Sequence, residues 1–221
     1  MTLYTNRSNI PPGSDSLATF PINNYAHGDH SFVGNGQYNN ACGKFSYVGN
    51  GGGVDTATPS PLGNEAHADY SFIGNGVTNQ VTSQSAFSFI GDGCQNKIGG
   101  SIAGALGAEY GFIGSGQNNC IDTGTAMSTL TPFGVIGGGQ NNKICAGTCY
   151  SSIVGGQDNC VLHNWATVAG CGVTSLMDCA FHTNVIISTD MPSIGASPAG
   201  TLMYLAGVPG VPAGYCVVVT C

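Results

Sequence analysis

The chain has 221 residues, of which 36 are Gly and only 7% are Asp, Glu, Lys or Arg. Amphipathic helices need charged outer faces and lose about 1 kcal/mol for each interior Gly, so this composition excludes a helical bundle. The 42% of hydrophobic residues excludes a disordered chain. With four cations and a net charge of −7, the chain has no basic stripe for a nucleic acid or an anionic membrane surface.

Residues 1–26 contain three prolines and no continuous apolar run. We therefore expect an extended N-terminal arm rather than a conventional signal sequence. Such an arm suits the joining of a virion or of a neighbouring subunit in a filament. The most apolar stretch, residues 201–219, is interrupted by two prolines and several glycines, so we expect no membrane span.

Residues 27–174 repeat one short phrase: a small residue, an aromatic or aliphatic residue, Val or Ile, and then Gly-x-Gly-x-x-Asn. The first Gly of the phrase stands at positions 34, 49, 74, 91, 114, 137, 155 and 170, at intervals of 15 to 25 residues. Short units that recur along a chain are typical of solenoids, in which each unit forms one coil and longer intervals carry loops. The sequence therefore predicts an all-β parallel roll, with loops near 56–65, 100–108 and 122–131.

Each phrase predicts a strand of about four residues followed by a Gly turn. In a pleated strand Phe32 and Val33 point to opposite faces, so one side chain fills the coil while the other stays at the surface. A coil of some 15 residues is too narrow to bury both faces, and we expect a partner to cover the outer one. A ring of three identical chains does this without leaving an open edge.

The Gly and Asn residues of the phrase have expected structural roles. The glycines provide either positive φ at a corner or room where backbones crowd. The terminal Asn tolerates the left-handed region and can form a ladder with the Asn of the next coil. An ordinary sandwich with hairpins at each phrase is the alternative, but a sandwich does not need the same phrase at every turn. Gly34-x-Gly36 and its copies lack the following helix or Lys of a phosphate loop.

The ten cysteines follow the repeat in part. Cys120 and Cys160 directly follow a terminal Asn, whereas Cys42 and Cys145 lie three residues after theirs. Equivalent positions stack in a solenoid, so some thiols are expected close together, between coils or between chains. Disulfides of an oxidising environment and small buried thiols both fit this pattern. The candidates are Cys42, Cys94, Cys120, Cys145, Cys149, Cys160, Cys171, Cys179, Cys216 and Cys221.

We expect no catalytic site, no metal and no cofactor. The acidic residues do not recur as a pair at repeat spacing, and no Gly-x-Ser-x-Gly turn frames a nucleophile. Cys145, Cys149 and His163 only approach a zinc pattern, and a turn explains the segment 27–30 (His-Gly-Asp-His) equally well. The regular outward Thr ladders of an ice-binding solenoid are missing.

From Ser175 onward the phrase disappears. The segments 181–189, 200–205 and 215–220 predict the strands of a C-terminal cap, residues 175–221, which would protect the open end of the roll. Within one strand Cys216 and Cys221 would lie about 16 Å apart, too far for a disulfide. We therefore expect them to pair elsewhere or to remain thiols.

One stretch carries a family resemblance. Gly137-Gly138-Gly139-Gln140-Asn141-Asn142, followed by Tyr150-Ser151-Ser152-Ile153-Val154-Gly155-Gly156-Gln157-Asp158-Asn159, resembles the YadA-type head repeats of trimeric autotransporter adhesins, which also occur in phage and other viral fibres. The match is best over 134–172 and looser over 27–116. The resemblance implies a left-handed parallel β-roll that forms a homotrimer and serves attachment.

The chain departs from those adhesins in ways that shape the functional prediction. It shows neither the a/d heptads of a coiled-coil stalk nor the alternating lipid-facing strands of a membrane anchor. We therefore predict a trimeric virion fibre, of tail or capsid, that binds a glycan or protein on the host surface through residues that the sequence does not identify. A self-assembling extracellular filament or a bacterial surface adhesin subunit is the alternative. Both place the protein on a virion surface or outside the cell.

Overall fold

The computed structural model describes residues 17–18, 23–53, 62–100, 107–122, 130–184, 202–204 and 216–218, of which the first and the last two ranges are described by their backbone alone. These residues form strands and turns. None of them belongs to a helix that could cross a membrane. The chain divides into two compact units, residues 1–182 and 183–221, which are described separately.

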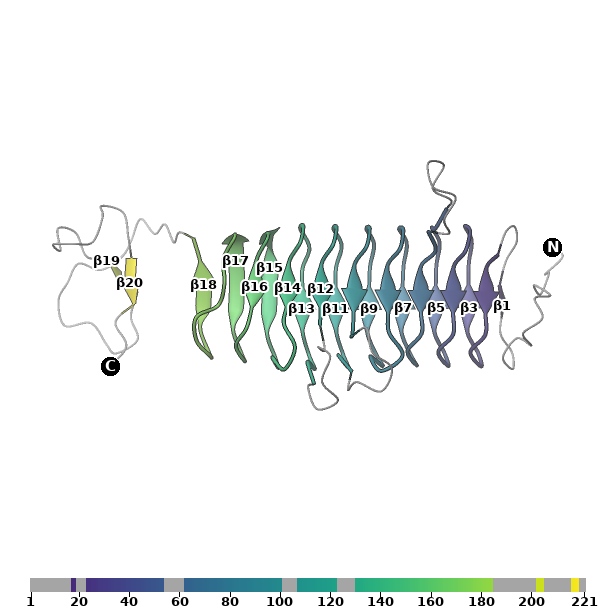
Figure 1. Cartoon of the computed structure of the whole chain (residues 1–221), viewed down its shortest axis with the longest axis horizontal. Coiled ribbons are helices and arrows are strands. Elements are labelled where there is room, and N and C mark those ends of the chain that lie inside the picture. The colour runs from purple at the N-terminus through teal and green to yellow at the C-terminus, as the bar shows by residue number, and fades with distance from the viewer. Residues whose placement is uncertain are drawn as a thin grey trace. The chain divides into compact units, whose positions relative to one another are not determined.

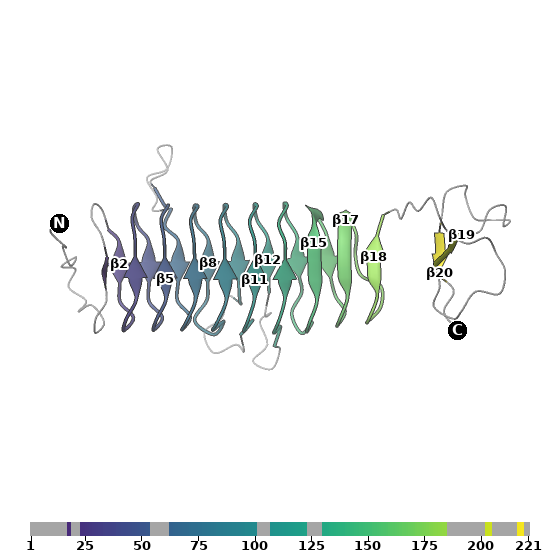
Figure 2. The same ribbon diagram turned by 180° about the vertical axis from the view of Figure 1, so that it is seen from behind.

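The first unit is a parallel β-solenoid built from two sheets (Figures 1 and 2). The first sheet contains, in spatial order, β1 (Leu17–Ala18), β3 (Phe32–Val33), β5 (Tyr47–Val48), β7 (Phe72–Ile73), β9 (Phe89–Ile90), β11 (Phe112–Ile113), β13 (Val135–Ile136), β15 (Ser152–Gln157), β17 (Thr167–Cys171) and β18 (Phe181–Thr183). The second sheet contains β2 (Tyr25–Ala26), β4 (Asn40–Ala41), β6 (Glu65–Ala66), β8 (Gln80–Val81), β10 (Lys97–Ile98), β12 (Cys120–Ile121), β14 (Lys143–Ile144) and β16 (Cys160–Val161). From β1 to β17 successive strands alternate between the sheets, and this confirms the predicted all-β parallel roll.

Each coil has two short strands where the sequence analysis expected one longer strand. In every coil but one the residue before the terminal Asn has a positive φ, 61° at Tyr38, which turns the chain through a corner; the exception is Gly63, before Asn64. The strand Phe32–Val33 therefore ends early, and a second strand begins directly after Asn39. Equivalent residues are in register from coil to coil, as in the pairs Phe32 with Tyr47 and Asn40 with Glu65.

The first sheet extends beyond the repeat phrase at both ends. Its strand β1 lies within the segment expected to be an arm, and β18 lies within the segment expected to be a cap. Strand pairing uses backbone groups, so a coil without the Gly-x-Gly phrase can still continue the ladder. The predicted loops fall mostly on residues outside the described ranges.

A single layer of small and β-branched side chains fills the space between the two sheets. The inward residues are Ala26, Val33, Ala41, Val48, Ala66, Ile73, Val81, Ile90, Ile98, Ile113, Ile121, Ile136, Ile144, Ile153, Val161 and Val168. All but Ala26 are completely buried. The expected alternation is confirmed, because Val33 is buried whereas Phe32 is half-buried on the outer side.

The terminal Asn residues form a buried hydrogen-bonded ladder. Asn39 donates its backbone N–H to Oδ1 of Asn24 (3.0 Å), and its Nδ2 donates to the carbonyls of Asn35 (2.9 Å) and Gly51 (2.8 Å). The ladder contains Asn24, Asn39, Asn64, Asn79, Asn96, Asn119, Asn142 and Asn159. The expected ladder is therefore confirmed. The ladder residues do not themselves use the left-handed conformation that Asn tolerates, because in most coils the preceding residue adopts it.

Both expected roles of Gly occur, and the second glycine of the phrase combines them, since it has positive φ and is also crowded by the next coil. The second one, Gly36, has a φ of 96°. The first one, Gly34, would place a Cβ 2.2 Å from the carbonyl oxygen of Gly49 in the next coil. The crowding is therefore between consecutive coils of one chain.

In the second unit the structure describes one antiparallel pair, β19 (Leu202–Tyr204) with β20 (Cys216–Val218). Both strands lie within segments that were expected to form strands of the cap. Cys221 lies outside the described residues, so the expectation about its pairing with Cys216 stays a prediction.

We expect Ile136→Asp to lower the free energy of unfolding by several kcal/mol, because it places an unpaired charge in the closed layer between the sheets. Val154→Asp is the control, since Val154 is 62% exposed in the neighbouring strand β15. Thermal unfolding followed by circular dichroism compares the two. A melting temperature of Ile136→Asp equal to that of the control would contradict the burial.

The Asn ladder is tested by Asn79→Ala. Asn79 accepts the backbone N–H of Asn96 and donates to the carbonyls of Asn75 and Gly93, so its loss leaves several buried groups unpaired. We expect a loss of at least about 2 kcal/mol in unfolding free energy. Asn75→Ala makes the same change at an exposed position and should leave stability nearly unchanged.

Candidate interaction face

A column of stacked rings runs along one corner of the solenoid. Its members are His30, Phe45, Tyr70, Phe87, Tyr110, Phe133, Tyr150 and Trp165, named here the corner column. Neighbouring ring centroids are 4.7 to 5.9 Å apart, and the ring planes differ by 1 to 16°. The seven rings from Phe45 onward are 41 to 56% exposed. The coils therefore present a continuous aromatic edge to solvent.

Every member of the corner column has an unfavourable backbone conformation. Their φ angles lie between 51 and 59°, in the left-handed region that costs a non-Gly residue about 1–2 kcal/mol. An aromatic stacking contact contributes about 0.5–1.5 kcal/mol, which roughly offsets that strain. Gly or Asn would meet the backbone requirement with less strain. The aromatic side chains therefore give this corner stacking and an apolar surface that the turn itself does not require.

A second column of rings lies on the outer side of the first sheet. Phe32, Tyr47, Phe72, Phe89 and Phe112, named here the strand column, stack with centroids 4.7 to 5.2 Å apart. In later coils the equivalent positions hold Val135, Ser152 and Thr167, and the hydroxyls of the last two are 2.9 Å apart. Stacking in the strand column is thus limited to the earlier coils.

The two columns are neighbours because their members are two residues apart in sequence. Between Phe45 and Tyr47, for example, Ser46 points inward and its hydroxyl donates to the carbonyl of Gly43 at 2.7 Å. We call the corner column and the strand column together the aromatic strip. The sequence analysis expected one outward residue in each strand without saying which, and it missed the corner column. An aromatic residue two positions before most strands of the first sheet was the signal that would have identified it.

The ring orientation limits what the strip can bind. Each ring covers the faces of its neighbours, so the column presents ring edges to solvent. Ligands that stack on an aromatic face, as nucleobases do, have no access to these faces along the column. A flat apolar surface can pack against the edges.

The outer side of the second sheet is polar by contrast. A cavity of about 440 Å³ is lined there by Tyr25, Asn40, Glu65, Gln80 and Lys97 together with residues of the adjoining turns. Within it Gln80 Nε2 donates to Glu65 Oε2 at 2.6 Å. The two sides of the solenoid therefore differ in chemistry.

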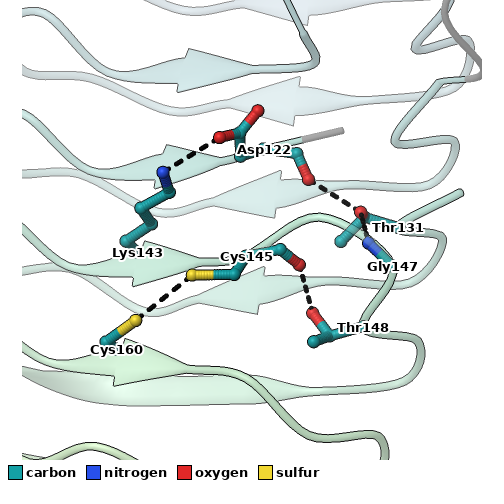
Figure 3. Close-up of polar contacts among 7 residues, drawn as sticks. All are labelled: Asp122, Thr131, Lys143, Cys145, Gly147, Thr148 and Cys160. Atoms are coloured by element: carbon teal, nitrogen blue, oxygen red, sulfur yellow. Dashed lines mark hydrogen bonds and ion pairs between the residues drawn. The ribbon is translucent and has the colours of Figure 1, made fainter. Parts of the chain in front are cut away.

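Two of the candidate cysteines are brought together. The sulfurs of Cys145 and Cys160, in consecutive coils, are 3.2 Å apart (Figure 3). Burial, followed by the hydrogen bond to Cys160, raises the pKa of Cys145 to about 12. Burial also raises the pKa of Cys120 to about 11.

The other candidate cysteines lie at separate places. Cys42 is half-buried and its sulfur is 3.1 Å from Oδ1 of Asn40, while Cys94 and Cys149 are half-buried. Cys171 and Cys179 are exposed. Cys216 is described by its backbone in β20, and Cys221 lies outside the described residues.

The residues considered for metal binding point to different partners. His27 stacks on Tyr25, whereas His30 stacks on Phe45 in the corner column, so the two histidines contact different rings. His163 Nδ1 is 2.9 Å from the hydroxyl of Ser175, whereas Cys145 contacts Cys160. Across the described ranges, no group of three or more His, Cys, Asp or Glu residues is arranged to hold a metal ion.

Several carboxylates have structural partners. Asp69 accepts the backbone N–H of Lys44, and Asp178 accepts that of Asn164, both at 2.8 Å and both between consecutive coils. Asp122 pairs with Lys143 at 2.9 Å and raises the pKa of that lysine (Figure 3). These carboxylates link coil to coil.

The sequence matches no protein-family model and no curated protein. The resemblance to YadA-type head repeats therefore stays a prediction that depends on the motif.

The raised pKa of Cys120 predicts slow alkylation. At pH 8 only a small fraction of a thiol with a pKa of about 11 is thiolate, the reactive form. We expect iodoacetamide to modify Cys120 more than tenfold more slowly than the exposed Cys179, and the rate at Cys120 to rise about tenfold for each pH unit below its pKa. Peptide mass spectrometry over time measures both rates. Unfolding in urea should abolish the difference, and equal rates in the folded protein would contradict it.

Proposed function

We propose that this chain is a structural, non-enzymatic β-solenoid that associates with further copies of itself through the aromatic strip. This proposal rests on the continuous corner column, in which seven rings are 41 to 56% exposed. At a coil spacing of about 4.8 Å, seven ring-to-ring steps span about 34 Å. A contiguous exposed apolar patch that extends over such a length is often functional.

Periodicity favours another copy of the chain as the partner. Ring edges recur at the spacing of the coils, so a partner matches them along their whole length only if it repeats at the same interval. A second copy of the chain has the same coil spacing because it has the same fold. The members of the strip from Phe45 onward are uncharged, so two strips approach without like-charge repulsion.

A homotrimer is the assembly we propose. In a closed ring of three chains each strip is covered by a neighbouring chain, and no strip stays open for further chains to add. The resemblance to YadA-type repeats supports the same number of chains and a left-handed roll. It also supports a role as an attachment fibre on a virion that binds a host-surface glycan or protein. An extracellular filament or surface adhesin subunit is the alternative, in which further copies add at the ends of the solenoid.

Self-association is tested with the triple variant Phe87→Asn, Tyr110→Asn, Phe133→Asn. Asn tolerates positive φ, so the corners keep their conformation while the apolar edges are lost. We expect sedimentation equilibrium to give three times the chain mass of 22.3 kDa for the native protein and a single chain for the variant. Circular dichroism checks that the variant is folded.

The control carries the same number of Asn substitutions at exposed apolar residues outside the strip: Leu162, Leu176 and Met177. It should remain trimeric. A native protein that sediments as one chain, or a strip variant that stays associated, would contradict the proposal. Electron microscopy of the native assembly then separates discrete rods, which support a fibre, from indefinitely long filaments, which support the alternative.

A further inference from the structure

We propose that Cys145 and Cys160 form a reversible disulfide that covalently joins two consecutive coils. Cys145 directly follows β14, and Cys160 begins β16, the neighbouring strand of the second sheet. Lys143 pairs with Cys160 and Ile144 with Val161, and the backbone N–H of Cys145 donates to the carbonyl of Val161 at 2.9 Å. This inference does not depend on self-association, because both thiols belong to one chain.

The two sulfurs already face each other at 3.2 Å (Figure 3). A disulfide holds its sulfurs about 2.05 Å apart, so bond formation draws them together by a little more than 1 Å. In the register of β14 and β16 Cys160 lies opposite Lys143, so Cys145 approaches it diagonally, and the hydrogen bond from Cys145 to Val161 fixes its backbone there. The contact is therefore a built-in feature of the fold.

The neighbourhood makes the pairing selective. Cys120 occupies the same outward column as Cys160, but Lys143 lies between them in the register and is held by Asp122. Cys149 lies at the following corner, where its backbone N–H donates to Oδ1 of Asn164 at 2.7 Å. Cys145 is thus the thiol placed to react with Cys160.

A low-molecular-weight disulfide, such as oxidised glutathione, supplies the oxidant. One protein thiolate attacks it, forming a mixed disulfide and releasing one glutathione thiol. The second protein thiol then loses its proton and attacks the mixed disulfide, which releases the second glutathione. In total two protein thiols lose two protons and two electrons, and one glutathione disulfide becomes two thiols. Excess reductant reverses both steps.

The position of the pair suggests what the bond contributes. Ring stacking in the strand column ends at Phe112, so the later coils lack those contacts between consecutive coils. A disulfide from Cys145 to Cys160 closes one coil there and opposes its separation from the next. The oxidised form is therefore expected to resist unfolding at this end of the solenoid.

The test incubates the full chain with oxidised glutathione and digests it with chymotrypsin. Cleavage after Tyr150 separates the two cysteines, so a disulfide appears as two linked peptides that fall apart on reduction. Tandem fragmentation assigns the link to Cys145 rather than Cys149. We expect this link, together with a melting temperature several degrees higher than in excess dithiothreitol.

Cys145→Ser and Cys160→Ser should each abolish both the link and the shift in melting temperature. Cys120→Ser and Cys149→Ser, the matched controls, should retain both. The proposal is overturned if oxidation stops at glutathione adducts, if Cys145 or Cys160 links to another cysteine, or if the controls lose the link.

Discussion

The backbone hydrogen bonds between consecutive coils are the constraint on which the rest of the structure depends. They hold each coil one strand spacing, about 4.8 Å, from the next. At that distance a Cβ on Gly34 would collide with the carbonyl of Gly49, so the first glycine of the phrase follows from the spacing. The same distance brings Asn39 within hydrogen-bond reach of Asn24 and stacks Phe45 on Tyr70. The high content of Gly and Asn and the low content of charged residues follow from this close spacing of the coils.

Polar and apolar contacts both hold the coils together, at different places in the solenoid. The inner layer of Val and Ile excludes water, and the Asn ladder satisfies the backbone groups that the corner would otherwise bury without partners. Outside, ring stacking and side chains such as Asp69 connect each coil to the next. Every coil relies on its neighbours, which is the general property of solenoids.

The aromatic strip and the polar side of the second sheet give the solenoid two distinct surfaces. Rings are held at positive φ along the corner although Gly would be less strained there, and their edges remain exposed. Described carboxylates such as Asp69 and Asp178 bind backbone groups of adjacent coils. These features support a structural role in which the strip meets a partner of the same period.

The sequence by itself determined the repeat, the all-β parallel fold and the identity of equivalent residues, because a solenoid maps a linear period directly onto stacked coils. It also showed that Val33 and Phe32 face opposite sides of their strand, since alternation along a strand is a local property, whereas the structure decided that Val33 is the inner one. The second strand of each coil, the corner column and the contact between Cys145 and Cys160 were decided only by the tertiary structure. They depend on where the chain turns, and the turns occur at residues such as Tyr38 and Phe45, whose side chains give no local preference for positive φ. Only the packing of one coil on the next imposes that conformation, and it thereby decides which side chains face one another.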